Sequence, residues 1–328
     1  MGMNRRAGVI GLAVATALAA GFGSGTAQAQ AFPAKAITVI VGFAPSGGTD
    51  ITARVIARKF QEIIGQSVVV ENRAGAGGNI AADLIAKAQP DGYTISLAAV
   101  GPLTVAPHMV ANLPYDPRRD IAPITLAVSF ANVLVVHPSV PANNIAEFIR
   151  LAGAKPDSIG YATSGIGGTG HLAGELFRML GRAPVIHVPY KGGGPAMTDL
   201  LGGQVPSGFA SAPSAIPHIK SGKIRALGVT TAKRTSFLPD VPAISESLPG
   251  YEAANWYAYV APGRTPKPII DRLNRDLVRS LNDPEIRAEL AKHGMEAIPS
   301  TPEEMARYVE REYAVWGKVV KEAKIEAQ

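Results

Sequence analysis

The chain has 328 residues, of which 47% are hydrophobic and 18% are charged, and its net charge is +6. This length is about twice that of an ordinary domain, which favours two lobes, and the hydrophobic content excludes a disordered chain. Because the sequence has no cysteine, disulfides, thiolate metal sites, a cysteine nucleophile and a lipid-modified N-terminal cysteine are all excluded. Aromatic residues make up only 6%, and no dense basic cluster occurs, so a nucleic-acid surface is not predicted.

The N-terminus has the pattern of a secretory signal peptide. Arg5 and Arg6 precede an apolar run over 7–20, and small residues lead to an Ala-Gln-Ala site at 27–29. The apolar run is shorter than the roughly 20 residues that cross a bilayer. We therefore expect residues 1–29 to be cleaved and the rest to be exported to the periplasm without a lipid anchor. An ordinary buried helix is the alternative interpretation.

From residue 37 onward, short apolar runs alternate with helical patterns. Strands are expected at 37–43, 67–70, 93–99, 159–162, 185–188, 207–211, 224–230 and 256–260, with a longer apolar stretch at 124–136. Helices are expected at 51–64, 80–88, 143–153, 171–180, 195–201, 268–282 and 302–324. This alternation is typical of βαβ units and a parallel sheet, which makes the fold class α/β. The order strand, glycine-rich turn, helix occurs at 37–64 and again at 159–180, which predicts two similar lobes that face each other across a cleft.

Three loops between a strand and a helix combine glycines with polar side chains. They are APSGGTD at 44–50, TSGIGGTGH at 163–171 and VPYKGGGPA at 188–196. The start of a helix leaves backbone N–H groups free, and glycines let an oxygen anion approach them closely. The loops therefore indicate an anion site, with Ser46 and Thr49 as further donors and with Tyr190 and Lys191 at the cleft. A plain turn with Thr49 or Asp50 as the helix cap, and a solvated surface lysine, are the alternatives.

Cofactor and metal motifs are incomplete in this sequence. Gly165, Gly167 and Gly170 match the dinucleotide pattern G-x-G-x-x-G, but no Asp or Glu lies between Glu175 and Asp199, where the acid for the ribose belongs. Six histidines are scattered without a metal-binding pair. We predict no cofactor and no metal.

Catalytic motifs are also lacking. No G-x-S-x-G segment occurs, and a Ser–His–Asp triad cannot be placed. His171, just inside a helix after a glycine-rich loop, is the best single candidate for a ligand contact, and a structural histidine in the first turn is the alternative. We predict no catalytic residue. An exported hydrolase that uses Ser164 or Ser46 with His171 is the alternative for an enzyme.

Several segments follow, in order, the pattern of one known family. They are FAPSGGTD at 43–50, VVVENRAGAGGNIAA at 68–82, PDGYT at 90–94, YATSGIGGTGHLAGELF at 161–177, VPYKGGGPA at 188–196, SGKIRALGVT at 221–230, LPDVPAISE at 238–246 and PGYEAANWYAYVAPGRTPKPIIDRLN at 249–274. Together they resemble the extracytoplasmic substrate-binding component of tripartite tricarboxylate transporters, the TctC or Bug family. The resemblance implies a two-lobed periplasmic binding protein of type II, a Venus flytrap with a hinge of crossing strands and a ligand cleft between the lobes. It places lobe 1 at 30–130, continued by 231–328, and lobe 2 at 131–230.

The resemblance also implies a ligand site. In this family a small carboxylate is held chiefly by main-chain amides, hydroxyls and ordered water at two strand–helix loops. The matching positions here are Phe43, Ser46, Gly47, Gly48, Thr49, Asp50, Thr163, Ser164, Gly165, Gly168, His171, Tyr190 and Lys191. Asp50 is expected to orient its loop rather than touch an anion, because like charges repel. Pro206 stands where the family usually has an Asp that helps select an ammonium, which makes an amino acid a less expected ligand.

The implied function is that of a periplasmic solute-binding protein. It captures a small organic carboxylate, a di- or tricarboxylate or an aromatic acid, for a tripartite tricarboxylate-type transporter. Integral-membrane permease subunits are the implied partners, and the protein is expected to be a monomer that binds no nucleic acid. A partner that presents a carboxylate to a membrane sensor kinase is the alternative, because the same pocket would serve.

Overall fold

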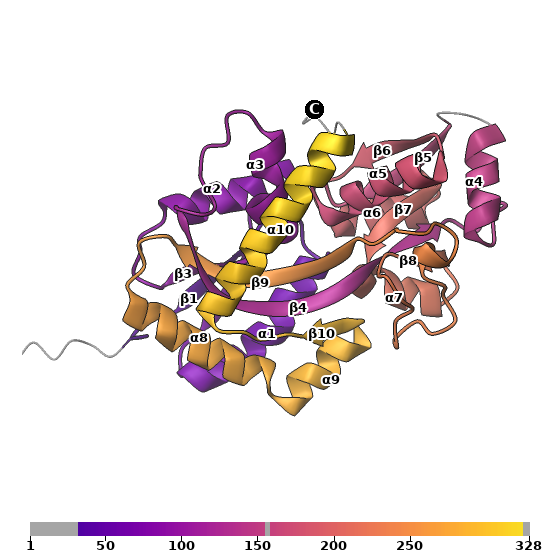
Figure 1. Ribbon diagram of the computed structural model, residues 1–328. Coiled ribbons are helices and arrows are strands. Elements are labelled where there is room, and N and C mark those ends of the chain that lie inside the picture. The colour runs from indigo at the N-terminus through magenta and orange to yellow at the C-terminus, as the bar shows by residue number, and fades with distance from the viewer. Residues whose placement is uncertain (1–31, 155–157, 324–328) are drawn as a thin grey trace, which may run out of the picture. The chain divides into compact units, whose positions relative to one another are not determined.

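The computed structural model describes residues 32–154 and 158–323 (Figure 1). The chain divides into two units, Met1–Ala34 and Lys35–Gln328, and all helices and strands of the described residues lie in the second unit. The predicted signal peptide at 1–29 lies outside the described residues. Within the described ranges, no helix has the length and hydrophobicity needed to cross a bilayer.

A ten-stranded sheet organises this unit, in the order β2-β1-β3-β9-β4-β7-β5-β6, with β8 and β10 also paired to β4. The strands are β1 (Ile37–Val41), β2 (Val68–Asn72), β3 (Thr94–Ala99), β4 (Ile121–Val136), β5 (Ile159–Thr163), β6 (Val185–Pro189), β7 (Ser207–Ser211), β8 (Arg225–Val229), β9 (Ala254–Pro262) and β10 (Met295–Ala297). The predicted parallel pairing is confirmed at both ends of the sheet, in β2-β1-β3 and in β6-β5-β7. The centre differs from that prediction, because β9 pairs antiparallel with both β3 and β4, and β7 pairs antiparallel with β4.

Strand β4 joins the two halves of the sheet. Its residues 121–131 pair with β9, whereas its residues 132–136 pair with β7. Strands β4 and β9 run side by side from the part of the unit that holds β1 and β3 toward the part that holds β5–β7 (Figure 1). The predicted apolar stretch at 124–136 is this strand, which begins three residues earlier and is buried along most of its length. A continuous apolar strand is expected where both faces of a sheet are covered.

Helices cover the sheet. The helices are α1 (Gly48–Ile64), α2 (Asn79–Lys87), α3 (Ala106–Met109), α4 (Ile145–Ala154), α5 (Thr169–Gly181), α6 (Gly193–Leu201), α7 (Ala212–Lys220), α8 (Lys267–Leu281), α9 (Pro284–Lys292) and α10 (Pro302–Ala323), with 3-10 turns at 76–78 and 244–246 and a π-helical turn at 101–105. Every helix expected from the sequence is present, with shifts of a few residues at the ends. Helices α3, α7 and α9 were not predicted; α3 has four residues, and α7 and α9 have nine each.

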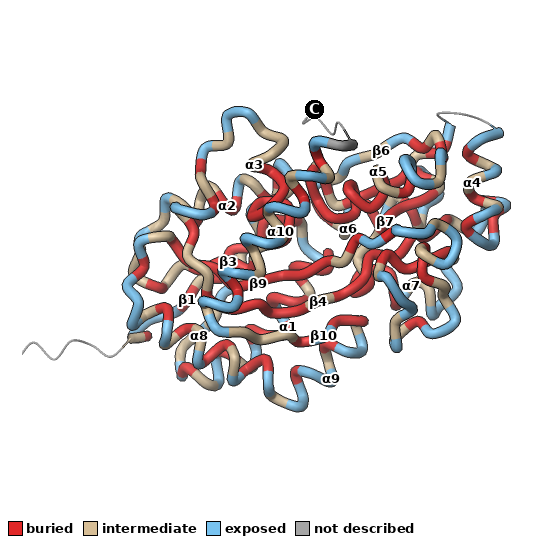
Figure 2. The backbone as a smooth tube through the Cα atoms, in the orientation of Figure 1, coloured by how far each residue is buried: buried red, intermediate tan, exposed pale blue. Residues whose placement is uncertain are grey.

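The core lies between the sheet and these helices, where the central strands are buried along most of their length (Figure 2). Trp256 on β9 and Trp316 on α10 are both buried in this core. Helix α1 buries Ile56 and Phe60 and ends at Gly65, whose φ of 67° is left-handed and suits glycine. The fold therefore holds the strand ends and the helix starts that follow them in fixed positions.

Candidate functional site

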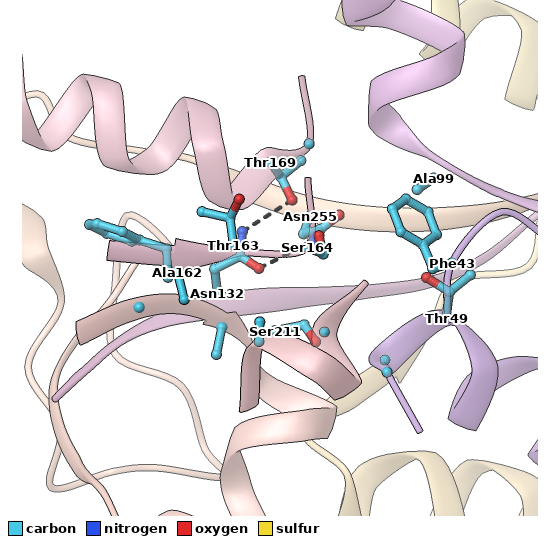
Figure 3. Close-up of a pocket in the computed structure, with 18 of the residues that line it drawn as sticks. Phe43, Thr49, Ala99, Asn132, Ala162, Thr163, Ser164, Thr169, Ser211 and Asn255 are labelled. Carbon is cyan, nitrogen blue, oxygen red and sulfur yellow. Dashed lines mark hydrogen bonds between the residues drawn. The ribbon is translucent and has the colours of Figure 1, made fainter. Parts of the chain in front are cut away.

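One cavity lies where the carboxyl ends of strands from both halves of the sheet meet the starts of helices (Figure 3). About 670 Å³ of space lies between its lining atoms, part of it open to solvent. The lining residues are Phe43, Gly47, Gly48, Thr49, Ala99, Val100, Gly101, Asn132, Ala162, Thr163, Ser164, Gly168, Thr169, Gly193, Ala196, Met197, Leu200, Gly208, Phe209, Ala210, Ser211, Asn255 and Tyr257. None of these side chains is acidic, basic or a histidine, so recognition in this cavity depends on neutral groups.

Three helices, α1, α5 and α6, begin at this cavity. Each is preceded by a glycine at the N-cap position, Gly47, Gly168 and Gly192, and none has a hydrogen bond from a capping side chain. The first N–H groups of a helix have no partner within the helix, and the helix dipole makes this end positive. The three helix starts together give the cavity a positive character without a cation.

The loop before α1 is held in place by Asp50, which is buried. Its carboxylate accepts hydrogen bonds from the backbone N–H of Ser46 at 2.9 Å, from Arg54 Nε at 2.9 Å and from Asn72 Nδ2 at 3.0 Å. Burial raises the pKa of Asp50, but these hydrogen bonds and the charge of Arg54 outweigh it and hold the pKa below its ordinary value. These contacts tie the Asp50 carboxylate to its own loop and to Arg54 and Asn72.

The loop before α5 is held by two neutral imidazoles. Thr163 Oγ1 lies 2.6 Å from His187 Nε2, and the backbone N–H of Gly167 donates to His171 Nδ1 at 3.2 Å. The two imidazole rings stack with their centroids 3.9 Å apart. Burial lowers the pKa of both histidines, and it lowers the pKa of His187, with His171 beside it, to about 3. Both rings are therefore uncharged at neutral pH.

A group of amides and hydroxyls forms one wall of the cavity, on β4, β7 and β9. Asn255 Nδ2 donates to Asn132 Oδ1 at 3.3 Å, and Asn132 Nδ2 donates to Thr169 Oγ1 at 3.1 Å. The hydroxyl of Tyr257 forms side-chain hydrogen bonds with Thr49 and Ser211, while its burial raises its pKa.

Sequence reasoning missed most of these wall residues. Tyr257 lines the cavity because neighbouring residues of β9 point to opposite faces and Trp256 takes the core side. The available signal was an amide, Asn132 or Asn255, inside a largely apolar strand. Strand β7, expected from the sequence at 207–211, also lines the cavity.

Seven of the thirteen residues expected at the site line the cavity. They are Phe43, Gly47, Gly48, Thr49, Thr163, Ser164 and Gly168. Figure 3 shows Phe43 and Thr49 on one side of the cavity, with Thr163 and Ser164 on the other. The structure thus brings residues from two distant segments of the chain to one site.

The other six lie around the cavity rather than in its lining. Asp50 and His171 are buried behind their loops, and Gly165 is buried next to Ser164. Ser46 is exposed and has a left-handed φ of 65°.

Tyr190 and Lys191, the last two of these six, belong to the loop before α6. The Tyr190 hydroxyl donates to Asp199 Oδ2 at 2.7 Å, and its burial and the Asp199 carboxylate raise its pKa to about 12. Lys191 is exposed, but its backbone carbonyl accepts a hydrogen bond from the N–H of Ala44 at 3.0 Å.

This hydrogen bond is one of several main-chain contacts between the two halves of the sheet. A Cβ atom on Gly101 would lie 2.8 Å from the carbonyl oxygen of Gly167, and one on Gly194 would press against the carbonyl oxygen of Pro45. A Cβ atom on Gly47 would lie 3.2 Å from the backbone nitrogen of Gly193. The loops of the two halves therefore touch through bare backbone beside the cavity.

Among the described residues, no group of acidic or histidine side chains could hold a metal ion.

The comparison with known proteins decides the family. The sequence model of the tripartite tricarboxylate transporter family receptor, TctC, matches residues 52–325. The chain belongs to the TctC family.

Solved TctC-type structures are similar to this chain over most of its length. A protein of R. palustris with adipate is 38% identical, with a TM-score of 0.87, and the match covers 90% of this chain and 99% of that one. The periplasmic binding protein BugD is 36% identical, with a TM-score of 0.87 and coverage of 90% and 100%. MatC from Rhodopseudomonas palustris with bound malate is 31% identical, with a TM-score of 0.84 and coverage of 88% and 100%. The fold is accordingly that of a two-lobed periplasmic binding protein.

Proposed function

We propose that this protein binds a small organic carboxylate in the periplasm and delivers it to the membrane permease of a tripartite tricarboxylate transporter. The observation that carries this proposal is the meeting of three uncapped helix starts, α1, α5 and α6, at one cavity whose lining has no charged side chain. Such a site stabilises an anion through backbone N–H groups and helix dipoles. The adipate and malate held by two relatives support the same chemical class.

The carboxylate is bound by main-chain N–H groups of the loops before α1, α5 and α6, together with the hydroxyls of Thr49, Thr163 and Ser164. Hydrogen bonds to a charged group contribute about 1.5–3 kcal/mol each. Four or five of them, less the cost of closing the lobes, correspond to roughly −8 kcal/mol, which is micromolar affinity.

Lobe 1 consists of residues 30–130 and 231–328, and lobe 2 consists of residues 131–230. Strands β4 and β9 serve as the hinge between the lobes. A ligand that touches both lobes favours the closed arrangement only by its difference in affinity for the two forms. The main-chain contacts from Ala44 to Lys191 and from Gly47 to Gly193 support closure directly over the cavity.

The signal peptide at 1–29 directs export and is then cleaved. The mature protein acts as a monomer and performs no chemistry on its ligand. The imidazoles beside the site support binding rather than catalysis. His171 Nδ1 accepts the Gly167 N–H, and His187 Nε2 is hydrogen bonded to Thr163. Both rings thus serve to hold the loop.

A panel of mono-, di- and tricarboxylates tests the proposal by the shift in melting temperature of the purified protein. We expect at least one carboxylate to raise the melting temperature. The proposal fails if the whole panel leaves it unchanged while an uncharged solute raises it.

A pair of variants at Gly193, the first residue of α6, tests the role of the backbone. Alanine keeps the N–H group, and its Cβ would find no atom closer than 3.6 Å, so affinity is expected to stay within about threefold. Proline is tolerated at the first position of a helix but lacks the N–H group, so Gly193→Pro is expected to weaken carboxylate binding about tenfold or more. Calorimetric titration of both variants gives the comparison, and equal affinities would argue against main-chain recognition at α6.

A further inference from the structure

Asn255 carries a hydrogen-bonding atom to which no described residue forms a hydrogen bond. Its side chain lines the cavity, and the residue is only 6% exposed. Its Nδ2 donates to Asn132 Oδ1, whereas its Oδ1 has no hydrogen-bond partner among the described residues. A buried acceptor without a partner costs about 1–3 kcal/mol. A ligand that supplies the missing partner recovers this loss.

The neighbours of Asn255 fix its amide in place. Asn132 donates onward to Thr169 Oγ1, and the backbone N–H of Asn132 donates to Thr230 Oγ1 at 2.9 Å. If the amide of Asn255 alone turned over, two oxygens that only accept would face each other, those of Asn255 and Asn132. If both amides turned over, Asn132 would donate to Asn255 and accept from the Thr169 hydroxyl, and the nitrogen of Asn255 would be the atom without a partner. A hydroxyl group both donates and accepts, so it can pair with either end of the amide.

Other polar groups fit this position less well. An ammonium would pair with Oδ1, but the cavity has no acidic lining residue to compensate its charge. A carboxylate only accepts hydrogen bonds and therefore cannot pair with Oδ1. Asn255 lines the same cavity as Ser164, and Asn132 links it to Thr169, the first residue of α5, whose start is proposed to bind the carboxylate. The side chain that carries the unpaired Oδ1 atom therefore lines the same cavity as the loops proposed to bind the carboxylate.

We propose that Asn255 makes this protein selective for hydroxycarboxylates, acids that carry a hydroxyl group close to the carboxylate. This inference rests on the proposed function, because it assigns a second group of the same ligand. Asn255 is a specificity residue: it pairs with the hydroxyl, while the carboxylate is bound by the helix starts. Loss of the hydroxyl from the ligand, or of the amide from the protein, is expected to remove the same interaction.

Matched acids that differ by one hydroxyl test the inference. Isothermal titration calorimetry compares malate with succinate, lactate with propionate, and mandelate with phenylacetate. With the unaltered protein we expect the hydroxy acid to bind about tenfold more tightly in each pair that binds. In Asn255→Leu we expect this preference to fall to about twofold, with affinity for the acid without the hydroxyl retained. Asn112→Leu, an exposed asparagine in a turn, serves as the matched control and is expected to keep the full preference.

The possible outcomes separate the two proposals. If carboxylates bind but no pair shows a preference, or if Asn255→Leu keeps the preference, this inference is overturned and the proposed function stands. If no carboxylate binds, both are overturned. Asn255→Ala provides a second test should the leucine variant fail to fold, and the comparison of matched acids on the unaltered protein needs no variant.

Discussion

The loops before α1 and before α5 are alike at the cavity and different behind it. Gly47 and Gly168 both have extended backbone angles, with φ of −83° and −74°, and both precede a helix without a side-chain cap. Behind the first loop lies a charged carboxylate, Asp50, paired with Arg54. Behind the second loop lies a stack of two uncharged imidazoles, His171 and His187.

The difference shows which features an anion site of this kind requires. Both loops present free backbone N–H groups from glycine-rich turns, so that is the shared requirement. The supports vary, but neither leaves an unpaired negative charge facing the cavity, because the Asp50 carboxylate is engaged by Ser46, Arg54 and Asn72. An unpaired carboxylate there would repel the ligand.

The largest expected effects come from adding one methyl group to a glycine of each loop. In Gly170→Ala the new Cβ would lie 2.7 Å from the backbone oxygen of Phe209 on β7, so a strand must move. We expect the free energy of unfolding to fall by about 2–3 kcal/mol. In Gly48→Ala the Cβ would lie 2.6 Å from Ser211 Oγ and 2.9 Å from the Tyr257 hydroxyl oxygen, and both side chains can shift. Here we expect a loss of stability below about 1 kcal/mol and a loss of carboxylate affinity of about tenfold.

Urea unfolding and calorimetric titration measure the two effects separately. Gly153→Ala in α4 is the control, because nothing lies within 4 Å of the added Cβ, and it is expected to leave stability equal or slightly higher. The added Cβ meets movable side chains at Gly48 but backbone at Gly170. Equal destabilisation by Gly48→Ala and Gly170→Ala would contradict this distinction.

Patterns within short segments of the sequence predicted those parts of the fold that such segments determine. The parallel ends of the sheet and the glycine-rich turns follow from the alternation of apolar runs and helical segments. Helix α7 was missed because Pro213 and Pro217 lie within it, and proline usually ends a helix. Helix α9 was missed because Asp283 follows directly on α8, although it caps the new helix by accepting from the backbone N–H of Glu285.

The sequence predicted the cavity residues that lie in the loops, but not those on the central strands. The loop glycines were found because their chemistry lies in one short segment. Asn132 and Asn255 were missed because they meet at the cavity only through the pairing of β4 with β9, between residues 123 positions apart. No local pattern indicates which of the polar residues in two separate strands will be neighbours.

A change of pH is expected to affect stability differently through the Asp50 carboxylate and through the stacked imidazoles of His171 and His187. The pKa of His187 is about 3 in the folded chain, chiefly because of burial, against an ordinary value of 6.5. Between these values the unfolded chain binds a proton that the folded chain does not, so stability falls as the pH falls below 6.5. We expect His187 to account for a loss of about 1–2 kcal/mol between pH 7 and pH 5.

Urea unfolding at pH 7 and pH 5 checks this expectation. His187→Gln should lose less stability over this interval than the unaltered protein. Asp50 provides the contrast, because its pKa is held below its ordinary 3.8 and its contribution is lost only at lower pH. Asp50→Asn should therefore lower stability by a similar amount at pH 7 and pH 5. If His187→Gln keeps the full pH dependence, the imidazole support is not the origin of it.

The smallest expected effect concerns Lys191, the cation in the loop before α6. Its side chain is exposed, and its contact with the first loop is made by its backbone carbonyl, which Lys191→Ala retains. An exposed charge contributes little to a neighbouring interaction in water. We therefore expect Lys191→Ala to change carboxylate affinity by less than about twofold, at both low and high salt. A tenfold loss that disappears at high salt would mean that the ammonium reaches the ligand, and the two loops would then no longer form a clamp of neutral groups alone.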